Sequence, residues 1–183
     1  SGVCHSDLSA MNGTIPQAPP AVLGHEGAGV VTDVGSAITH VGPGDHVIIA
    51  FSPPCGTCAY CTGRGQPNLC LTGYFTMNSN PQFRQGDNVV GSMTGCGTFA
   101  EETIVAGIAA IKIDNDVPLD VAALVGCGVT TGVGAALNTA KVTPGSSVMV
   151  IGAGGVGIAA IQGAAIAGAA VIVAVDLPEG KLD

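Results

Sequence analysis

Hydrophobic positions in the first 130 residues fall into short runs that glycine, proline and polar residues interrupt. Four of these runs are rich in residues typical of β-strands, and they span 28–34, 46–51, 99–105 and 108–113. Residues 53–98 carry cysteine, proline and glycine throughout and predict a long loop-rich insert. The pattern therefore predicts an irregular β-rich domain over residues 1–130.

The pattern then becomes helical and afterwards alternates between strand and helix. Apolar residues at helical spacing predict helices over 117–124 and 129–140. A strand, a helix and a second strand are predicted next, at 148–151, 155–167 and 170–175. We therefore expect a mixed fold, in which residues 131–183 supply one β-α-β unit of an α/β domain.

One apolar stretch is long enough to cross a bilayer, because no charged residue occurs between Val142 and Val175. Proline and several glycines interrupt it, and its period changes from β-branched to alanine-rich and back. A buried strand, helix and strand explain this pattern better than a membrane span. We therefore expect no association with a membrane.

Composition narrows the classes of function. The chain has 183 residues, of which 47% are hydrophobic and 10% charged, and its net charge is -8. Nucleic acid and anionic membranes would require the opposite sign, and this much apolar sequence excludes a disordered chain. Seven cysteines, an odd number, and no visible signal peptide argue against a secreted disulfide scaffold. Clustered cysteines in a cytoplasmic protein point to metal binding.

The first cysteine cluster is local. Its spacing is Cys-x2-Cys-x2-Cys-x8-Cys, formed by Cys55, Cys58, Cys61 and Cys70. Four thiolates close in sequence can complete a tetrahedron around Zn²⁺ with no open position, which is a structural zinc site. An iron–sulfur site is the alternative, because thiolates serve both metals.

The second candidate set is dispersed along the chain and consists of Cys4, His25 and Cys127. Two cysteines and one histidine with an open fourth position form one of the known catalytic zinc sites. Each residue alone is weak support, because a single histidine or cysteine is usually structural. We expect such structural roles for His40, His46 and Cys96.

A glycine motif, Gly-Ala-Gly-Gly-Val-Gly at 152–157, lies between a predicted strand and a predicted helix. Asp176 ends the next strand, 19 residues after Gly157. Such glycines let the backbone approach a pyrophosphate, and the acid accepts from a ribose hydroxyl, which favours NAD over NADP. Close packing of a helix on a sheet is the alternative. The candidate cofactor-binding residues are Gly152, Gly154, Gly155, Val156, Gly157 and Asp176.

Together and in this order, these motifs resemble the zinc-containing medium-chain alcohol dehydrogenases. The matching stretches also include Gly-Val-Cys-His-Ser-Asp at 2–7, Gly-His-Glu-Gly-Ala-Gly at 24–29 and Gly-Cys-Gly-Val-Thr-Thr-Gly at 126–132. The sequence Gly-Gln-Pro-Asn-Leu-Cys at 65–70 looks most like the class III-like bacterial branch of this family. The resemblance implies a GroES-like catalytic domain over 1–130, a structural-zinc lobe at about 53–98, and the start of an NAD-binding Rossmann domain.

The resemblance also implies a role for each candidate residue. Two Zn²⁺ ions would be bound per chain, the catalytic one by Cys4, His25 and Cys127 and the structural one by the four-cysteine cluster. Ser6 would take the proton of the alcohol, His5 would lie near the cofactor pyrophosphate, and Thr131 would lie near the nicotinamide. Asp7 would orient His25, and Glu26 would lie behind the metal.

The implied activity is oxidation of a small-molecule alcohol to an aldehyde by hydride transfer to NAD, in a cytoplasmic homo-oligomer. Two alternatives stay open: a dehydrogenase acting on an S-(hydroxymethyl)thiol, and a non-catalytic fragment whose fold is stabilised by zinc. We interpret the chain as an internal piece of a longer protein, and we expect the piece alone to be inactive.

Two departures from the family pattern concern single positions. Eight residues separate Cys61 from Cys70, where the family commonly has seven, so we expect the loop to bulge. Ser9 stands where some members have the histidine that ends the proton relay. The relay beyond Ser6 is therefore open.

Overall fold

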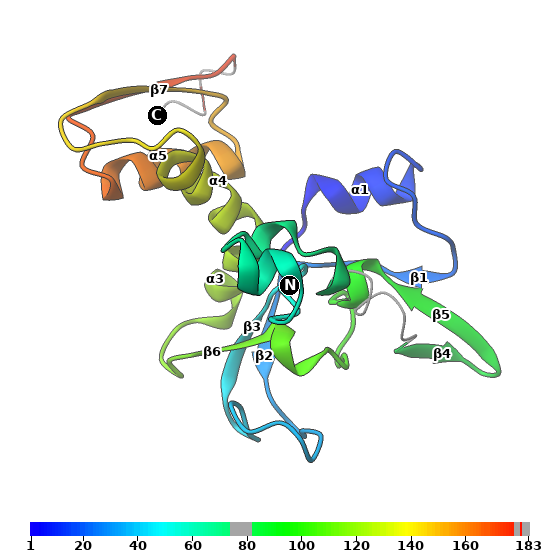
Figure 1. The fold of residues 1–183 in the computed structure, drawn as a ribbon. Helices are drawn as coiled ribbons and strands as arrows, with labels where there is room; N and C mark the ends of the chain where they lie inside the picture. The colour runs from blue at the N-terminus through cyan, green and yellow to red at the C-terminus, as the bar shows by residue number, and fades with distance from the viewer. Residues whose placement is uncertain (74–81, 178–179, 181–183) are drawn as a thin grey trace. The chain divides into compact units, whose positions relative to one another are not determined.

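The computed structural model describes residues 1–73, 82–177 and 180 (Figure 1). The chain divides into two compact units, Ser1–Gly126 and Cys127–Asp183. The sequence placed this division after residue 130, and the domain limits stay a prediction. Each unit is described by itself below.

An antiparallel sheet forms the centre of the first unit. Its strand order is β2–β3–β6, with β2 at Gly27–Val30, β3 at His46–Ile49 and β6 at Ala110–Ile113. Side chains alternate along β3, so Val47 and Ile49 are buried on the side that packs against the core. Two small clusters of buried residues complete this core: Ile49 with Cys96 and Ala109, and Val41 with Val47 and Ala110.

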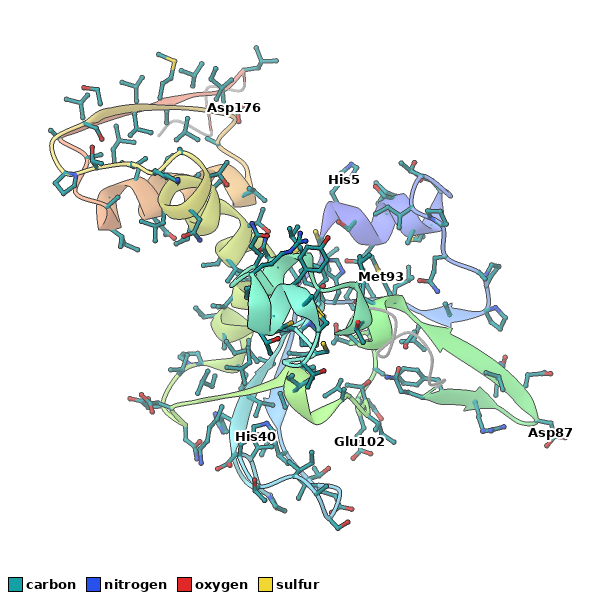
Figure 2. All side chains as sticks on the ribbon, in the orientation of Figure 1. His5, His40, Asp87, Met93, Glu102 and Asp176 are labelled. Atoms are coloured by element: carbon teal, nitrogen blue, oxygen red, sulfur yellow. The ribbon has the colours of Figure 1, made fainter. Side chains whose placement is uncertain are left out.

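A second sheet of the first unit has the order β1–β5–β4. Strand β1 (Ala21–Val22) runs parallel to β5 (Asn88–Ser92), and β5 pairs antiparallel with β4 (Phe83–Gln85). Figure 2 shows Asp87 at the tip of the β4–β5 hairpin. The segment over 53–98, predicted as a loop-rich insert, therefore contains a short hairpin.

Short helical turns supply much of the remaining order in the first unit. Helix α1 spans His5–Met11 and begins directly after Cys4. A single π-helical turn lies at Ala59–Gly63, and turns of 3-10 helix lie at Pro67–Leu69, Met93–Gly95 and Gly107–Ala109. The π turn contains Cys61, and the 3-10 turn Pro67–Leu69 lies in the loop between Cys61 and Cys70, for which a bulge was predicted.

A continuous helical stretch, Leu119–Thr139, contains α3 (Leu119–Leu124), α4 (Thr130–Gly134) and two π-helical turns, Val125–Val129 and Ala135–Thr139. It is long and apolar enough to cross a membrane by length and composition alone, a criterion that core helices of soluble proteins also meet. Gly126 in this stretch lies against β3, since a Cβ there would lie 2.8 Å from the Ile49 carbonyl oxygen.

The second unit contains the predicted β-α-β arrangement. Strands β7 (Ser147–Ile151) and β8 (Val171–Val175) pair in parallel, and helix α5 (Gly155–Ile166) connects them. Helices α4 and α5 approach closely at glycines, because a Cβ on Gly132 would lie 2.6 Å from that of Ala159. The predicted elements at 148–151, 155–167 and 170–175 are confirmed to within one residue.

One predicted strand is absent from the described structure. Residues 99–105 form bends and irregular backbone instead. Thr98 and Phe99 donate backbone hydrogen bonds to Gly24 and Leu23, but the pairing ends there. The next residues, Ala100 and two exposed glutamates, offer no hydrophobic alternation to continue it.

Candidate metal centres and nucleotide loop

The four cysteines of the local motif converge. The Sγ atoms of Cys55, Cys58, Cys61 and Cys70, which we call the lobe cluster, all lie within 4.8 Å of one another. Individual separations are 3.5 Å for Cys58–Cys61, 3.8 Å for Cys58–Cys70 and 4.0 Å for Cys55–Cys61. Four sulfur donors at such distances fit a tetrahedral zinc or iron–sulfur site, and the chemistry of the donor set is that of a closed structural centre.

Backbone N–H groups point at three of these sulfurs: those of Cys55, Cys70 and, from Gly56, Cys61. Cys58 N–H donates to Cys55 Sγ (3.3 Å), Cys55 N–H donates to Cys70 Sγ (3.2 Å), and Gly73 N–H donates to Cys70 Sγ (3.3 Å). Hydrogen bonds from Thr57 and then Cys58 lower the pKa of the Cys55 thiol to about 5. The N–H of Cys55 likewise lowers the pKa of Cys70. These bonds favour thiolates, which are the form that binds metal.

Cys61 differs from its neighbours in the lobe cluster. Desolvation by burial, and then the adjacent Cys58 thiol, raise its pKa to about 12. A bound cation would reverse this preference, because a coordinating thiol is deprotonated outright. Cys61 would therefore be a thiolate only with a cation bound in the lobe cluster.

The dispersed set also converges. One ligand atom from each of Cys4, His25 and Cys127, which we call the dispersed cluster, lies within 4.8 Å of the others. His25 is 2% exposed and lies just before β2, while Cys4 immediately precedes α1. Cys127 follows Gly126 directly, so the close packing of Gly126 on the Ile49 carbonyl fixes where Cys127 begins.

Asp7 ties these segments together. Its carboxylate accepts hydrogen bonds from the Cys4 N–H (2.9 Å) and the Gly24 N–H (3.0 Å), and the side chain is buried. His25 Nδ1 lies 3.4 Å from Asp7 Oδ1, close enough for an electrostatic interaction. The geometry of the two groups does not meet the criteria of a hydrogen bond. With Nδ1 facing the carboxylate, Nε2 is left as the ligand atom of the imidazole.

Two further side chains adjoin the dispersed cluster. Cys4 Sγ lies 3.6 Å from Ser6 Oγ, so the hydroxyl is next to a ligand sulfur. Phe51 packs edge-on against the His25 ring, at 5.7 Å between centroids and 77° between planes. Sequence reasoning did not find Phe51, because an aromatic residue at the end of a strand carries no signal for such a contact.

The remaining residues of the predicted site are placed as follows. His5 lies on α1 (Figure 2), and its Nδ1 lies 3.3 Å from the hydroxyl of Ser9. Glu26 is buried, and its carbonyl accepts the Gly2 N–H. Thr131 is an exposed residue of α4. Their predicted roles toward the cofactor and the metal stay predictions.

His40, His46 and Cys96 lie outside both clusters. His40 Nε2 lies 3.0 Å from the Gly107 carbonyl oxygen, and the His46 backbone N–H donates to Asn115. Cys96 is fully buried in the core, where desolvation raises the pKa of its thiol to about 11. It behaves as a small hydrophobic residue.

The glycine motif forms a tight turn between β7 and α5. Gly152 has φ +99°, which favours glycine, and a Cβ on Gly157 would collide with the Gly152 carbonyl. Asp176 Oδ2 accepts the Ala153 N–H at 2.7 Å, and its Oδ1 accepts the Leu177 N–H at 2.7 Å. The acid therefore braces this turn, and helix α5 begins at Gly155 directly after it.

Residues 1–115 match the GroES-like domain of alcohol dehydrogenases. The chain belongs to the alcohol dehydrogenase family. The predicted family and the GroES-like fold are thereby confirmed.

Relatives of this chain include enzymes with two kinds of name. Alcohol dehydrogenase B of Mycobacterium tuberculosis is 47% identical over 100% of the chain and 50% of the relative. S-(hydroxymethyl)glutathione dehydrogenase is 44% identical in Saccharomyces cerevisiae, covering 99% of the chain and 49% of the relative. The chain spans about half the length of the relatives that it matches.

Solved structures agree with this assignment. A zinc-binding-domain alcohol dehydrogenase protein from Burkholderia ambifaria superposes with a TM-score of 0.90 at 37% identity, covering 100% of this chain and 51% of that one. Benzyl alcohol dehydrogenase from Acinetobacter calcoaceticus superposes with a TM-score of 0.87 at 36% identity, with coverage of 100% and 50%.

Proposed function

We propose that this chain supplies the catalytic zinc site, the structural zinc lobe and the start of the NAD site of an enzyme that oxidises an alcohol to an aldehyde. The observation that supports this most strongly is the convergence of Cys4, His25 and Cys127 to within 4.8 Å. These residues come from three separate parts of the sequence, and a core of structural residues would not require their donor atoms to meet.

Zinc fits both clusters by the chemistry of their donors. The lobe cluster offers four sulfurs and the dispersed cluster two sulfurs and one imidazole nitrogen, the donor sets of a closed and an open zinc site. A zinc ion bound at the open site would act as a Lewis acid and favour loss of the alcohol proton.

The chain's own residues then have defined tasks. Ser6 Oγ, next to the ligand sulfur of Cys4, accepts the alcohol proton as its own hydroxyl proton passes outward. Asp7 holds Cys4 and the segment before His25 in one geometry through its two backbone hydrogen bonds. Phe51 packs against the imidazole ring and restricts its rotation.

The proposed cofactor is NAD, which supplies the hydride acceptor. Helix α5 begins in the turn at 152–157, and the first N–H groups of a helix, which have no intrahelical partner, favour a pyrophosphate. The Asp176 carboxylate accepts the Ala153 and Leu177 N–H groups beside this turn, and a carboxylate at this position can accept from a ribose hydroxyl. His5 and Thr131 would contact the pyrophosphate and nicotinamide ends.

A second candidate function is oxidation of an S-(hydroxymethyl)thiol, the adduct of formaldehyde with a thiol. It is favoured by relatives named S-(hydroxymethyl)glutathione dehydrogenase in yeast and in Escherichia coli, which are 44% and 43% identical to the chain. Comparing turnover of a simple alcohol with turnover of the thiol adduct separates the two. A cytoplasmic location and a homo-oligomeric enzyme stay predictions from the sequence.

The test replaces Cys127 by serine in the protein that carries this chain, with Cys96→Ser as the matched control. Cys127→Ser should abolish turnover and reduce the zinc content from two ions per chain to one. Cys96→Ser changes a buried cysteine outside both clusters and should leave the zinc content unchanged. Full turnover of Cys127→Ser would refute the assignment.

A further inference from the structure

The four sulfurs of the lobe cluster differ in how many backbone N–H groups they face. Cys70 accepts two such bonds, from Cys55 and Gly73, Cys55 accepts two, from Thr57 and Cys58, and Cys61 accepts one from Gly56. In the described part of the chain, no backbone N–H donates to Cys58 Sγ. Since N–H donors withdraw electron density from sulfur, Cys58 is the most electron-rich thiolate of the set.

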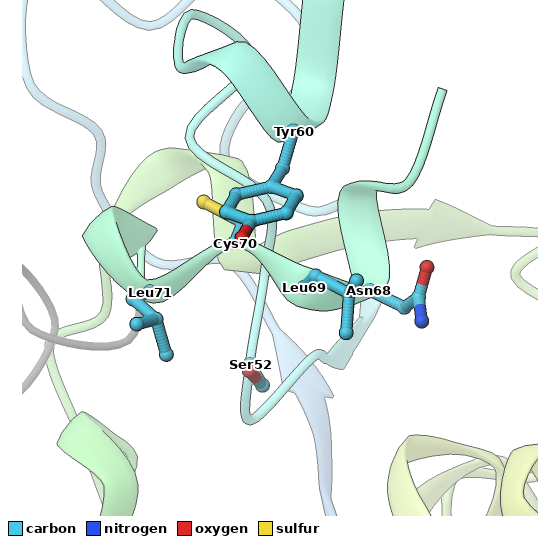
Figure 3. Close-up of a pocket in the computed structure, with 6 residues that line it drawn as sticks. All are labelled: Ser52, Tyr60, Asn68, Leu69, Cys70 and Leu71. Atoms are coloured by element: carbon cyan, nitrogen blue, oxygen red, sulfur yellow. The ribbon is translucent and has the colours of Figure 1, made fainter. Parts of the chain in front are cut away.

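Exposure also distinguishes these sulfurs. Cys70 is 6% exposed, whereas Cys55, Cys58 and Cys61 are half-buried. A hollow of about 460 Å³ borders Cys70 (Figure 3), lined by Ser52, Tyr60, Asn68, Leu69, Cys70 and Leu71. A small oxidant in this hollow could therefore react with Cys70 instead of Cys58. The two N–H bonds to Cys70 make it the poorer nucleophile of the two.

The nearest partner of Cys58 is Cys61, whose Sγ lies 3.5 Å away. The backbone between them is held by one turn, in which the N–H groups of Cys61 and Thr62 both donate to the Cys58 carbonyl at 3.0 Å. A disulfide needs sulfurs about 2.05 Å apart, so the two side chains must close the gap. Cys58–Cys61 is the shortest of the three sulfur–sulfur separations given above.

We infer that Cys58 and Cys61 form an oxidisable dithiol, through which a hydroperoxide converts the zinc lobe to a metal-free disulfide form. The inference rests on the proposed presence of zinc in the lobe. It assigns a modification site to residues that would otherwise serve only to hold the fold.

The chemistry balances with hydrogen peroxide as the oxidant. Cys58 thiolate attacks one peroxide oxygen and the O–O bond breaks. The other oxygen leaves as hydroxide, which takes up a proton to become water, and Cys58 is left as a sulfenic acid. Cys61 thiolate then attacks the sulfenic sulfur, and the hydroxyl leaves as a second water after taking up a proton. Two thiolates lose two electrons to the peroxide.

Loss of these two ligands leaves the metal with Cys55 and Cys70. Two thiolates cannot complete the closed tetrahedron that holds zinc, so the ion is released. The dispersed cluster uses none of these residues, and its metal should remain.

The experiment treats the zinc-loaded protein with hydrogen peroxide, follows zinc release with a chromogenic chelator, and maps disulfides by mass spectrometry of tryptic peptides. The expected result is one zinc released per chain, together with a disulfide joining Cys58 to Cys61. The Cys61→His variant keeps four ligands in the Cys3His set of known structural sites and should release the lobe zinc about ten-fold more slowly.

Cys96→Ser is the matched control and should release zinc like the parent chain. A disulfide joining Cys58 to Cys70 or Cys55 to Cys61, or zinc release without any disulfide, would overturn the inference alone. A lobe without zinc before the oxidant is added would contradict the proposed zinc site, and the inference with it. The zinc content before treatment therefore distinguishes the two failures.

Discussion

The ligand atoms lie within 4.8 Å of one another in both the lobe cluster and the dispersed cluster, but different parts of the structure bring them together. The lobe cluster draws its four ligands from residues 55–70, and short helical turns bring them together. The dispersed cluster draws three ligands from positions 4, 25 and 127, and it exists because Asp7 and Gly126 hold distant segments in place. Damage to the first cluster is therefore expected to be local, while the second depends on packing far from its ligands.

The largest effect should follow removal of a lobe ligand. Cys70→Ser takes away the buried ligand, and the lobe should lose its zinc, because structural zinc sites contribute on the order of 10 kcal/mol to folding. Limited proteolysis should cut the segment around 55–73 in the variant. Zinc retained at the dispersed cluster would support the independence of the two sites, and loss of both ions would contradict it.

A smaller but more diagnostic effect should come from Gly126→Ala. The added Cβ would lie 2.8 Å from the Ile49 carbonyl oxygen, so the helix must shift and move Cys127 with it. We expect loss of zinc from the dispersed cluster alone, measured as metal content after dialysis. Gly134→Ala, in the same helical stretch, meets its nearest atom at 3.8 Å and is the control.

If Gly126→Ala and Gly134→Ala retain the same zinc content, packing of Gly126 does not position Cys127. The claim that the dispersed cluster depends on packing far from its ligands would then be wrong.

Asp7→Asn should have the mildest effect of these substitutions. The amide keeps one acceptor oxygen but cannot serve both backbone N–H groups and face His25 as an anion. Partners of this kind typically change metal affinity by about 10–100-fold, and competition with a chelator should measure a loss in that range. Asp33→Asn alters an exposed carboxylate and should leave the affinity unchanged.

The contrast between the clusters also explains what the sequence could predict. The β-α-β unit and the lobe ligands follow from local patterns, and both lie where the spacing placed them. Helix α1 was not predicted, because residues 5–11 show no helical period. Its first turn depends on Asp7, whose carboxylate accepts the Cys4 N–H.

Tertiary contacts explain the remaining differences between the predicted and the observed structure. The predicted strand at 99–105 fails because its pairing with Leu23 and Gly24 ends after Phe99. The contact of Phe51 with His25 and the second hydrogen bond of Asp7, to Gly24, join segments that no short-range pattern connects. Residue types suggested the dispersed ligands and the family resemblance supported them, whereas their spacing alone could not show that they meet.

The central claim is that two zinc sites with different donor sets exist in this chain. Zinc analysis combined with X-ray absorption at the zinc edge tests it most directly. We predict two ions per chain and an average ligand shell that contains imidazole nitrogen beside sulfur, from six cysteine sulfurs and one histidine. A single ion with only sulfur around it would contradict the account.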